Sequence, residues 1–410
     1  MEFKAIRGVE DIIPPESEKF ERVVDTFKEI VKLSGFKEVI LPIFEEAKLF
    51  TRSVGETTDI VQKEMYVFQD KGGRTIALRP EGTASAVRAY VENGIYAREP
   101  FTKWFYVGPM FRFERPQAGR KRQFFQAGCE VFGIKEPGAD AELIKVASDI
   151  LKKLGIDAEL QINSIGCKKC RPEYRRALIS FLRERVNELC PTCRERLERN
   201  PLRVLDCKEE SCQEVVSRAP KITDFLCQEC KEHYERVKEY LKLLSVPFVE
   251  NPLLVRGLDY YTKTVFEFKS SKLGAQSTVL AGGRYDDLIE EIGGPRTPAL
   301  GFAMGIDRAI LLLPESKERR EGVFVVTRGE EAYRRGLKVV SFLREKGVKS
   351  EIDHRRGSFK AQMKAADRNR ARYALIIGEE EVENDFFSLR DLETGKQERV
   401  EGLEELLGRL

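Results

Sequence analysis

Apolar residues recur at helical spacing in some parts of the chain and alternate in others, and this pattern predicts the order of elements. Residues 17–33 show the periodicity of an amphipathic helix. The run FKEVILPIF, residues 36–44, is typical of a strand interrupted by Pro42. Residues 66–82 predict a hairpin with a glycine turn, and residues 82–93 predict a second helix.

Residues 103–133 consist of two long apolar runs joined by a polar loop, which predicts a strand, a loop and a second strand. Strand patterns return at 254–268, 281–294 and 299–313, and the last of these continues into a helix. Because loops rather than crossover helices join these strands, we expect an α+β domain with an antiparallel sheet flanked by helices.

Beyond a charged linker at residues 314–322, strands and helices alternate regularly. The pattern predicts strands at 322–327, 348–353 and 373–378, with helices near 331–346 and 358–371. Residues 322–410 are therefore expected to form a separate small α/β domain with a parallel sheet.

Charge and composition narrow the class of protein. The chain of 410 residues has 71 basic and 68 acidic residues, so any basic surface has to be local. No apolar run has the length of a signal peptide or a membrane span, and we expect a soluble, cytoplasmic protein with no membrane partner. Only two histidines occur, His233 and His354, and glycine-rich phosphate loops are lacking. Arginines would therefore have to hold any phosphate.

The arginine loop, residues 112–122, is strongly basic. A solvated hairpin tip is one interpretation. However, Arg112 and Glu114 share one face of their strand, and Phe124 returns on the opposite strand, where it could stack on a planar base. These features favour a nucleotide pocket. The loop's basic residues are Arg112, Arg115, Arg120, Lys121 and Arg122.

Two further arginines lie in apolar, strand-associated settings. Arg256 is the third residue of the segment LVRGLDYYTKTVFEF. A buried ion pair with Asp259 is the alternative explanation for this arginine. Arg308, in GFAMGIDRA, could be a helix-surface arginine paired near Asp307. Each is weak evidence alone, but together with Arg112 they favour a site for phosphate.

Eight of the nine cysteines lie between residues 167 and 230, in four short motifs. This spacing indicates metal binding. Eight cysteines with four ligands per ion would form two four-cysteine zinc sites, with structural roles. Buried reduced thiols are the alternative. The pairing of the motifs is open, His233 could replace one thiolate, and Cys129 is expected to fill the core. The predicted ligands are Cys167, Cys170, Cys190, Cys193, Cys207, Cys212, Cys227 and Cys230.

Basic residues recur every four positions near the C-terminus, which predicts a stripe suited to a phosphate backbone on one helix. A merely solvated face is the alternative. The stripe consists of Arg356, Lys360, Lys364, Arg368 and Arg372.

Several segments together resemble the histidyl-tRNA synthetase family of class II aminoacyl-tRNA synthetases. ILPIFEE, FRFERPQAGRKRQFFQAG and ALGFAMGIDRA resemble the three class II motifs, and LVRGLDYYTKTVFEF and AGGRYDDL are similar to the family's two signature segments. RGVEDIIPPE and GSFKAQMKAADRNRARYALIIGEEE extend the resemblance over nearly the whole chain.

The resemblance implies a set of site residues, with Arg256 and Arg112 as catalytic groups. Residues implied for ATP, bound with Mg²⁺, are Arg112, Glu114, Phe124 and Arg308. Residues implied for histidine are Glu81, Gly82, Thr83, Arg112, Gln126, Glu130, Arg256, Tyr260 and Tyr261. Residues implied for histidine tRNA are Gln117, Arg120, Lys360, Lys364 and Arg368.

The expected function is activation of L-histidine with ATP, followed by transfer to histidine tRNA. A non-catalytic, synthetase-like regulatory subunit of histidine biosynthesis is the alternative, and a pure RNA-binding module is a third possibility. The segment around Pro42 resembles the family's interface motif and implies a homodimer. The expected parts are a catalytic domain at 1–166 and 246–313, a cysteine-rich insertion domain at 167–245 and an anticodon-binding α/β domain at 322–410.

Overall fold

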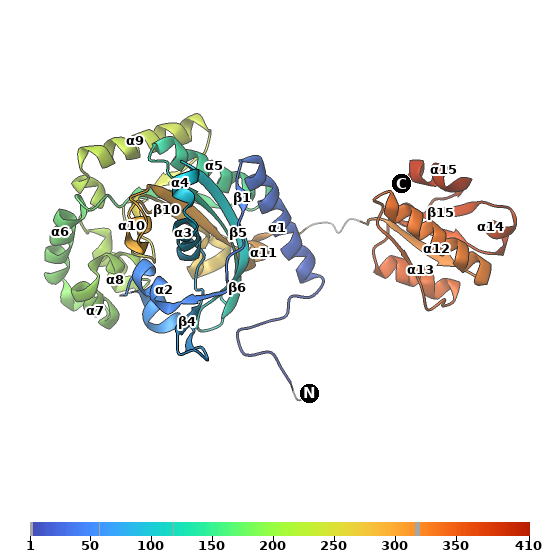
Figure 1. Cartoon of the computed structure of the whole chain (residues 1–410), viewed down its shortest axis with the longest axis horizontal. Helices are drawn as coiled ribbons and strands as arrows, with labels where there is room; N and C mark the ends of the chain where they lie inside the picture. The colour runs from blue at the N-terminus through green and yellow to red at the C-terminus, as the bar shows by residue number, and fades with distance from the viewer. Residues whose placement is uncertain (1–2, 57, 118, 316–319) are drawn as a thin grey trace. The chain divides into compact units, whose positions relative to one another are not determined.

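The protein divides into two compact units, Met1–Pro314 and Glu315–Leu410 (Figure 1). The computed structural model describes residues 3–56, 58–117, 119–315 and 320–410. Among these residues, no helix has the length and apolar character needed to cross a membrane.

An eight-stranded sheet forms the centre of the first unit. Its five inner pairs are antiparallel, but β1 joins β5 and β8 joins β7 in parallel, so the expected purely antiparallel sheet is corrected to a mixed one. In sheet order, the strands are β1 (Lys37–Glu38), β5 (Thr102–Phe111), β6 (Gln123–Phe132), β11 (Ala299–Gly305), β10 (Thr278–Arg284), β9 (Thr262–Lys269), β7 (Glu159–Ser164) and β8 (Val249–Glu250).

Four helices pack on one face of this sheet through a common apolar core. The rings of Phe105 and Phe302 from the sheet lie 6.0 and 6.4 Å from the ring of Phe27. Cys129 is fully buried in the same core, as expected of a core filler. The helices are α1 (Glu16–Leu33), α5 (Pro137–Leu154), α9 (Gln228–Leu243) and α11 (Ile306–Leu312).

The strand-like run at residues 36–44 is interrupted at Pro42 as expected, but its two parts belong to different sheets. β1 belongs to the large sheet, whereas β2 (Phe44–Glu46) pairs with β4 (Thr75–Leu78) in a separate three-stranded sheet. Pro42 lies between them and has no N–H to continue a ladder. The predicted hairpin is confirmed, because β3 (Val67–Gln69) pairs antiparallel with β4, and the second helix is α3 (Thr83–Glu92).

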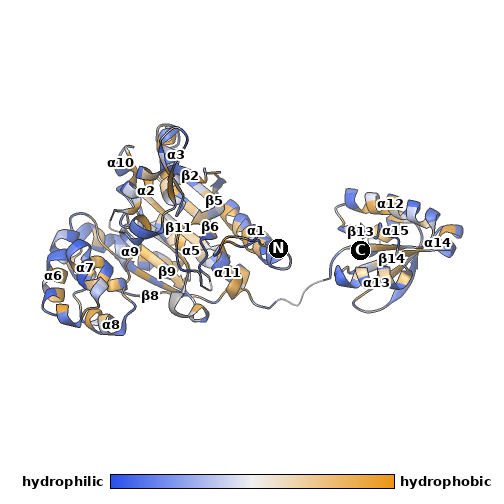
Figure 2. Cartoon of the chain, turned by 90° about the horizontal axis from the view of Figure 1, so that it is seen from below, coloured by the Kyte–Doolittle hydropathy of each residue, from blue (hydrophilic) through white to orange (hydrophobic). Residues whose placement is uncertain are grey.

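The cysteine-rich segment, residues 167–230, is helical, and its outer turns are hydrophilic (Figure 2). One apolar cluster includes Leu178 and Cys193 from this segment together with Leu254, Tyr260 and Tyr261. The segment therefore packs directly against the stretch that contains Arg256. Its longer elements are α6 (Arg171–Arg183), α7 (Pro191–Arg199), η3 (Pro201–Asp206) and α8 (Glu210–Ser217).

The second unit has a five-stranded sheet with helices on both faces. The predicted parallel sheet is right for the first three strands only, because the last two form an antiparallel hairpin that needs no crossover helix. In sheet order, the strands are β13 (Ser350–Ile352), β12 (Val323–Thr327), β14 (Tyr373–Ile377), β15 (Phe387–Asp391) and β16 (Gln397–Val400). The main helices are α12 (Glu330–Glu345), α13 (Phe359–Arg368) and α15 (Gly402–Arg409).

Candidate active site

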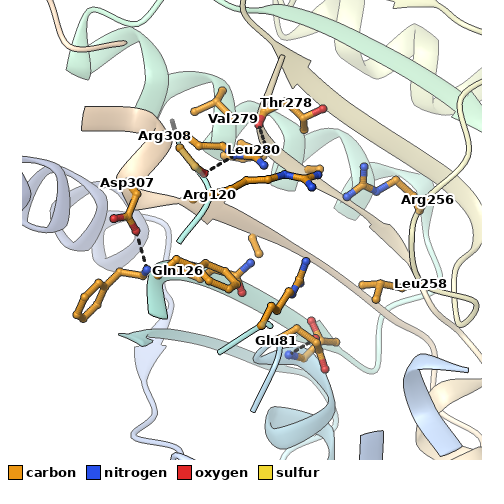
Figure 3. Close-up of a pocket in the computed structure, with 18 of the residues that line it drawn as sticks. Glu81, Arg120, Gln126, Arg256, Leu258, Thr278, Val279, Leu280, Asp307 and Arg308 are labelled. Carbon is orange, nitrogen blue, oxygen red and sulfur yellow. Dashed lines mark hydrogen bonds between the residues drawn. The ribbon is translucent and has the colours of Figure 1, made fainter. Parts of the chain in front are cut away.

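A pocket of about 180 Å³ lies over β6, β11 and β10, where these strands meet the arginine loop and the start of α3. Figure 3 shows Arg120, Arg256 and Arg308 along one side of the pocket, with Glu81 and Gln126 across from them. Arg112 also lines it, so residues far apart in the sequence bring four guanidinium groups to one cavity. Such a site suits a ligand with several negative charges.

The arginine loop contributes both charge and an aromatic surface. The guanidinium carbon of Arg112 lies 5.3 Å from the ring centroid of Phe124, and Arg112 Nε donates to the carbonyl of Pro80 at 2.9 Å. Arg120 pairs with Glu114 at 2.6 Å within the pocket lining. Of the loop's five basic residues, only Arg115 is exposed, so the solvated-tip interpretation does not describe the loop. The other four, Arg112, Arg120, Lys121 and Arg122, are partly buried.

Arg308 faces the pocket and not the helix surface. Its Nη1 donates to the carbonyl of Thr278 at 2.7 Å, whereas Asp307 pairs with Lys121 at 3.1 Å and accepts from the Phe125 N–H at 2.8 Å. The alternative of a surface arginine is therefore wrong. Burial lowers the pKa of Arg308, and the Arg120 charge lowers it further. An anionic ligand would relieve this repulsion.

Arg256 is paired with Glu267 of β9, and the expected alternative partner, Asp259, instead bonds Arg203 and Asn200. Glu267 also accepts from the Thr278 hydroxyl at 3.0 Å. Burial lowers the pKa of Arg256, but the adjacent Glu267 carboxylate outweighs it and holds that pKa above its usual value. Sequence reasoning missed Glu267; a lone carboxylate among the apolar residues of TKTVFEF was the available signal.

The start of α3 forms another part of the wall. The carboxylate of Glu81 accepts from the N–H groups of Thr83 and Ala84 at 2.7 and 2.8 Å, and burial raises the pKa of Glu81. A Cβ on Gly82 would lie 2.2 Å from the Tyr106 ring, so this position has room only for glycine. On the same side of the pocket, Gln126 Oε1 is buried and has no hydrogen-bonding partner among the described residues. That oxygen is available to a ligand.

Glu130 lies behind the pocket wall and not in its lining. It accepts hydrogen bonds from Thr83 Oγ1 at 2.8 Å, from Tyr106 at 3.1 Å and from Tyr285. Burial raises the pKa of Glu130 to about 8, although these donors oppose the shift. Tyr260 lines the pocket, with its ring centroid 5.6 Å from that of Tyr285. Tyr106 and Tyr285 were missed from the sequence, because nothing in their local pattern places them beside Glu130.

The eight clustered cysteines form two groups of four, with all sulfur atoms of a group within 4.8 Å of one another. The first and last motifs combine as Cys167, Cys170, Cys227 and Cys230, and the two middle motifs as Cys190, Cys193, Cys207 and Cys212. His233 replaces none of them, since its Nε2 lies 3.4 Å from the buried Asp140 carboxylate. Four convergent sulfur atoms fit a tetrahedral metal ion.

The candidate tRNA residues divide between the two units. Gln117 and Arg120 bridge each other through their main chains at the arginine loop. In the second unit, Lys360, Lys364 and Arg368 are all exposed on α13. The predicted longer stripe is corrected, because α13 begins after Arg356 and ends before Arg372, and those two arginines pair with acidic residues.

Comparison with known proteins agrees with this geometry along the whole chain. A family model described as Histidyl-tRNA synthetase matches residues 8–309, and one described as Anticodon binding domain matches residues 322–410. The chain is 55% identical to the histidine–tRNA ligase of Aquifex aeolicus, over 98% of this chain and 99% of that protein. It is 50% identical to the histidine–tRNA ligase of Halothermothrix orenii, over 98% and 97% of the two chains.

A solved structure gives the same result for the fold. The apo histidyl-tRNA synthetase of S. aureus superposes with a TM-score of 0.80 at 37% identity, and the match covers 99% of each chain. Both the catalytic and the anticodon-binding family models are matched, and the relatives align from end to end. The chain belongs to the histidyl-tRNA synthetase family.

Proposed function

We propose that the protein activates L-histidine with ATP to give histidyl-adenylate and pyrophosphate, and then transfers the histidyl group to the 3′-terminal adenosine of histidine tRNA. The observation that carries this function is the pocket in which Arg112, Arg256 and Arg308 converge beside Glu81 and Gln126. A regulatory subunit without catalysis would need neither this cluster nor an anticodon-binding domain, and the relatives at 55% and 50% identity are histidine–tRNA ligases.

In this proposal, the arginine side of the pocket binds ATP. Phe124 stacks on the adenine, with Glu114 beside the base, and Arg308 covers the other face and reaches the terminal phosphate. Arg112 contacts both the α-phosphate and the histidine carboxylate. ATP enters as its Mg²⁺ complex, in which the phosphate oxygens are hard ligands for that ion.

The opposite side binds histidine. The α-amino group donates hydrogen bonds to Glu81, Thr83 and the unpaired oxygen of Gln126. The rigid start of α3 fixes the positions of Glu81 and Thr83. Tyr261 and Tyr260 lie against the imidazole of the substrate. Glu130, which accepts a hydrogen bond from the Thr83 hydroxyl, lies at the same end of the histidine. A smaller amino acid would leave these buried groups unpaired, and a hydrogen-bonding site can discriminate by roughly 10⁴-fold or more on this basis.

Arg256 then stabilises the transition state. The histidine carboxylate attacks the α-phosphorus, the bond from phosphorus to the bridging oxygen breaks, and pyrophosphate leaves. No proton has to be removed from the nucleophile, because it is already ionised. Negative charge grows on the non-bridging oxygens, and a guanidinium fixed by Glu267 lowers the energy of that charge without reorganising.

An ATP–pyrophosphate exchange assay tests the proposal. Among the twenty amino acids, histidine alone should support exchange, and Arg256→Ala should lower the rate by about 10²-fold or more because charge development loses its partner. Arg115→Ala, an exposed change in the arginine loop, should leave the rate within twofold. No histidine-dependent exchange in the unmodified protein would overturn the function, and an unaffected Arg256 variant would overturn the role of Arg256.

The two cysteine groups each bind one Zn²⁺ in a closed, structural site. Four thiolates leave no ligand position for water, so the metal takes no part in adenylate formation. Elemental analysis of purified protein should find close to two zinc ions per chain, and Cys190→Ser should retain about one because it breaks a single group. Cys129→Ala, outside both groups, should retain two. Metal-free protein with full stability would support buried thiols instead.

A second copy of the chain covers the apolar surface around Pro42. Ile40, Ile43 and Phe44 are 92, 45 and 58% exposed, and neighbouring exposed apolar side chains of this kind mark protein–protein contact sites. Light scattering at micromolar concentration should therefore give a mass near twice the 47.0 kDa of one chain. The mass of a single chain would contradict this homodimer.

The three exposed basic residues of α13 bind the tRNA backbone. Changing Lys360, Lys364 and Arg368 together to Ala should remove about three phosphate contacts and flatten the salt dependence of tRNA binding. Aminoacylation at limiting tRNA should fall, while pyrophosphate exchange stays near the unmodified rate, because the described residues that line the pocket all belong to the first unit.

The matched control removes the same charge from other exposed positions of the second unit. Its three substitutions to Ala are at Lys338, Lys349 and Lys396. An equal loss of aminoacylation in both triple variants would show that only net charge matters, and an equal loss in exchange and aminoacylation would show that the α13 residues are structural.

A further inference from the structure

Two arginines of the cysteine-rich segment hold the backbone of the catalytic segment, which we define as residues 254–261. Arg171 Nη2 donates to the main-chain carbonyl of Tyr261, and Arg203 Nη2 donates to the main-chain carbonyl of Gly257. Gly257 directly follows Arg256 in the chain. The two contacts therefore hold the backbone beside Arg256 and at Tyr261, within the stretch that carries residues assigned to catalysis and histidine binding.

Each arginine lies beside the cysteines of a different four-cysteine group. Arg171 directly follows Cys170 and begins α6, and Arg203 lies in η3, between Cys193 and Cys207. The position of each guanidinium is thus set by the fold around one four-cysteine group.

The catalytic segment separates two cavities. Arg256, Leu258 and Tyr261 line the active-site pocket on one side and, on the other, a second cavity of about 640 Å³ whose wall includes Arg171 and Arg203. Leu254, Tyr260 and Tyr261 pack into the apolar cluster, whereas residues 255–259 between them are only half-buried. Hydrogen bonds therefore contribute strongly to the position of this middle part, which includes Arg256.

Further contacts hold the catalytic segment at Asp259. Asp259 lies 3.5 Å from Arg203 and accepts from Asn200 Nδ2 at 3.1 Å, while its N–H donates to the carbonyl of Val54 at 3.1 Å. A Cβ on Gly55 would lie 2.4 Å from Asp259, so the segment packs directly on backbone at that point. The catalytic segment is therefore held between α2 (Ala47–Val54) and the cysteine-rich segment.

We infer that Arg171 and Arg203 are positioning residues for adenylate formation, through which the cysteine-rich segment sets the geometry of the catalytic segment. This inference rests on the proposed function. Arg203 acts at Gly257 and fixes Arg256, which stabilises charge that develops only in the transition state. Arg171 acts at Tyr261 and fixes the side of the pocket that contacts the substrate imidazole.

The two contacts predict different kinetic losses. Arg203→Met should lower kcat for histidine-dependent pyrophosphate exchange by about tenfold to hundredfold with little change in the KM for histidine, because a misplacement of about 1 Å at the reacting groups has that effect. Arg171→Met should chiefly raise the KM for histidine, by about tenfold. Arg171→Lys and Arg203→Lys should recover part of each loss, since one donor suffices for one carbonyl.

The controls are Arg175→Met and Arg199→Met, which remove exposed arginines that line the same second cavity. Both should stay within twofold of the unmodified protein. The exchange assay contains no tRNA, so a loss cannot come from weaker tRNA binding at this basic surface.

Hydrogen exchange of the peptide that spans residues 254–262 gives a readout independent of activity. It should become faster in Arg171→Met and Arg203→Met and remain unchanged in the two controls, while thermal melting shows all variants folded. The inference would be overturned, and the proposed function kept, if the unmodified protein supports exchange and both arginine variants show the same kinetics and the same hydrogen-exchange protection as it does. An unmodified protein without histidine-dependent exchange would instead overturn the proposed function.

Discussion

The ion pair between Arg256 and Glu267 is the constraint around which the pocket is arranged. Burying an arginine away from water is costly unless a carboxylate is close, and Glu267 supplies it from β9 while Thr278 and Lys269 hold the other carboxylate oxygen. Burial raises the pKa of Glu267, but the Arg256 and Lys269 charges outweigh it and keep that pKa below its usual value. The cation is thus fixed before any substrate enters.

The alternation of β9 explains how one sheet serves both stability and chemistry. Phe266 and Phe268 pack into the core under the helices. Val265 belongs to the cluster on the pocket side, and Glu267 reaches Arg256. A shift of one residue in register would exchange the two faces. The antiparallel pairing of Glu267 with Ala281 on β10 therefore fixes which residues reach the substrate.

Local pattern predicted most of the elements, and the resemblance named many of the residues that line the pocket. The arginines, Phe124 and Gln126 lie together as the motifs imply, and the helix at 17–33 and the hairpin at 66–82 formed as their periodicity indicates. Long-range pairing could not be predicted: the partner of Arg256, the tyrosines around Glu130 and the combination of the cysteine motifs depend on contacts between distant segments. The hairpin of β15 and β16 was missed because its alternation is short and interrupted by charge.

The most direct test of the ion pair is a double-mutant cycle on the rate of pyrophosphate exchange, using Arg256→Ala, Glu267→Gln and the double variant, each shown to be folded by thermal melting. If Glu267 acts by fixing Arg256, Glu267→Gln alone should lower kcat by about tenfold to hundredfold, and the double variant should be no slower than Arg256→Ala. Losses that add independently, or a Glu267→Gln variant with the unmodified rate, would contradict this account.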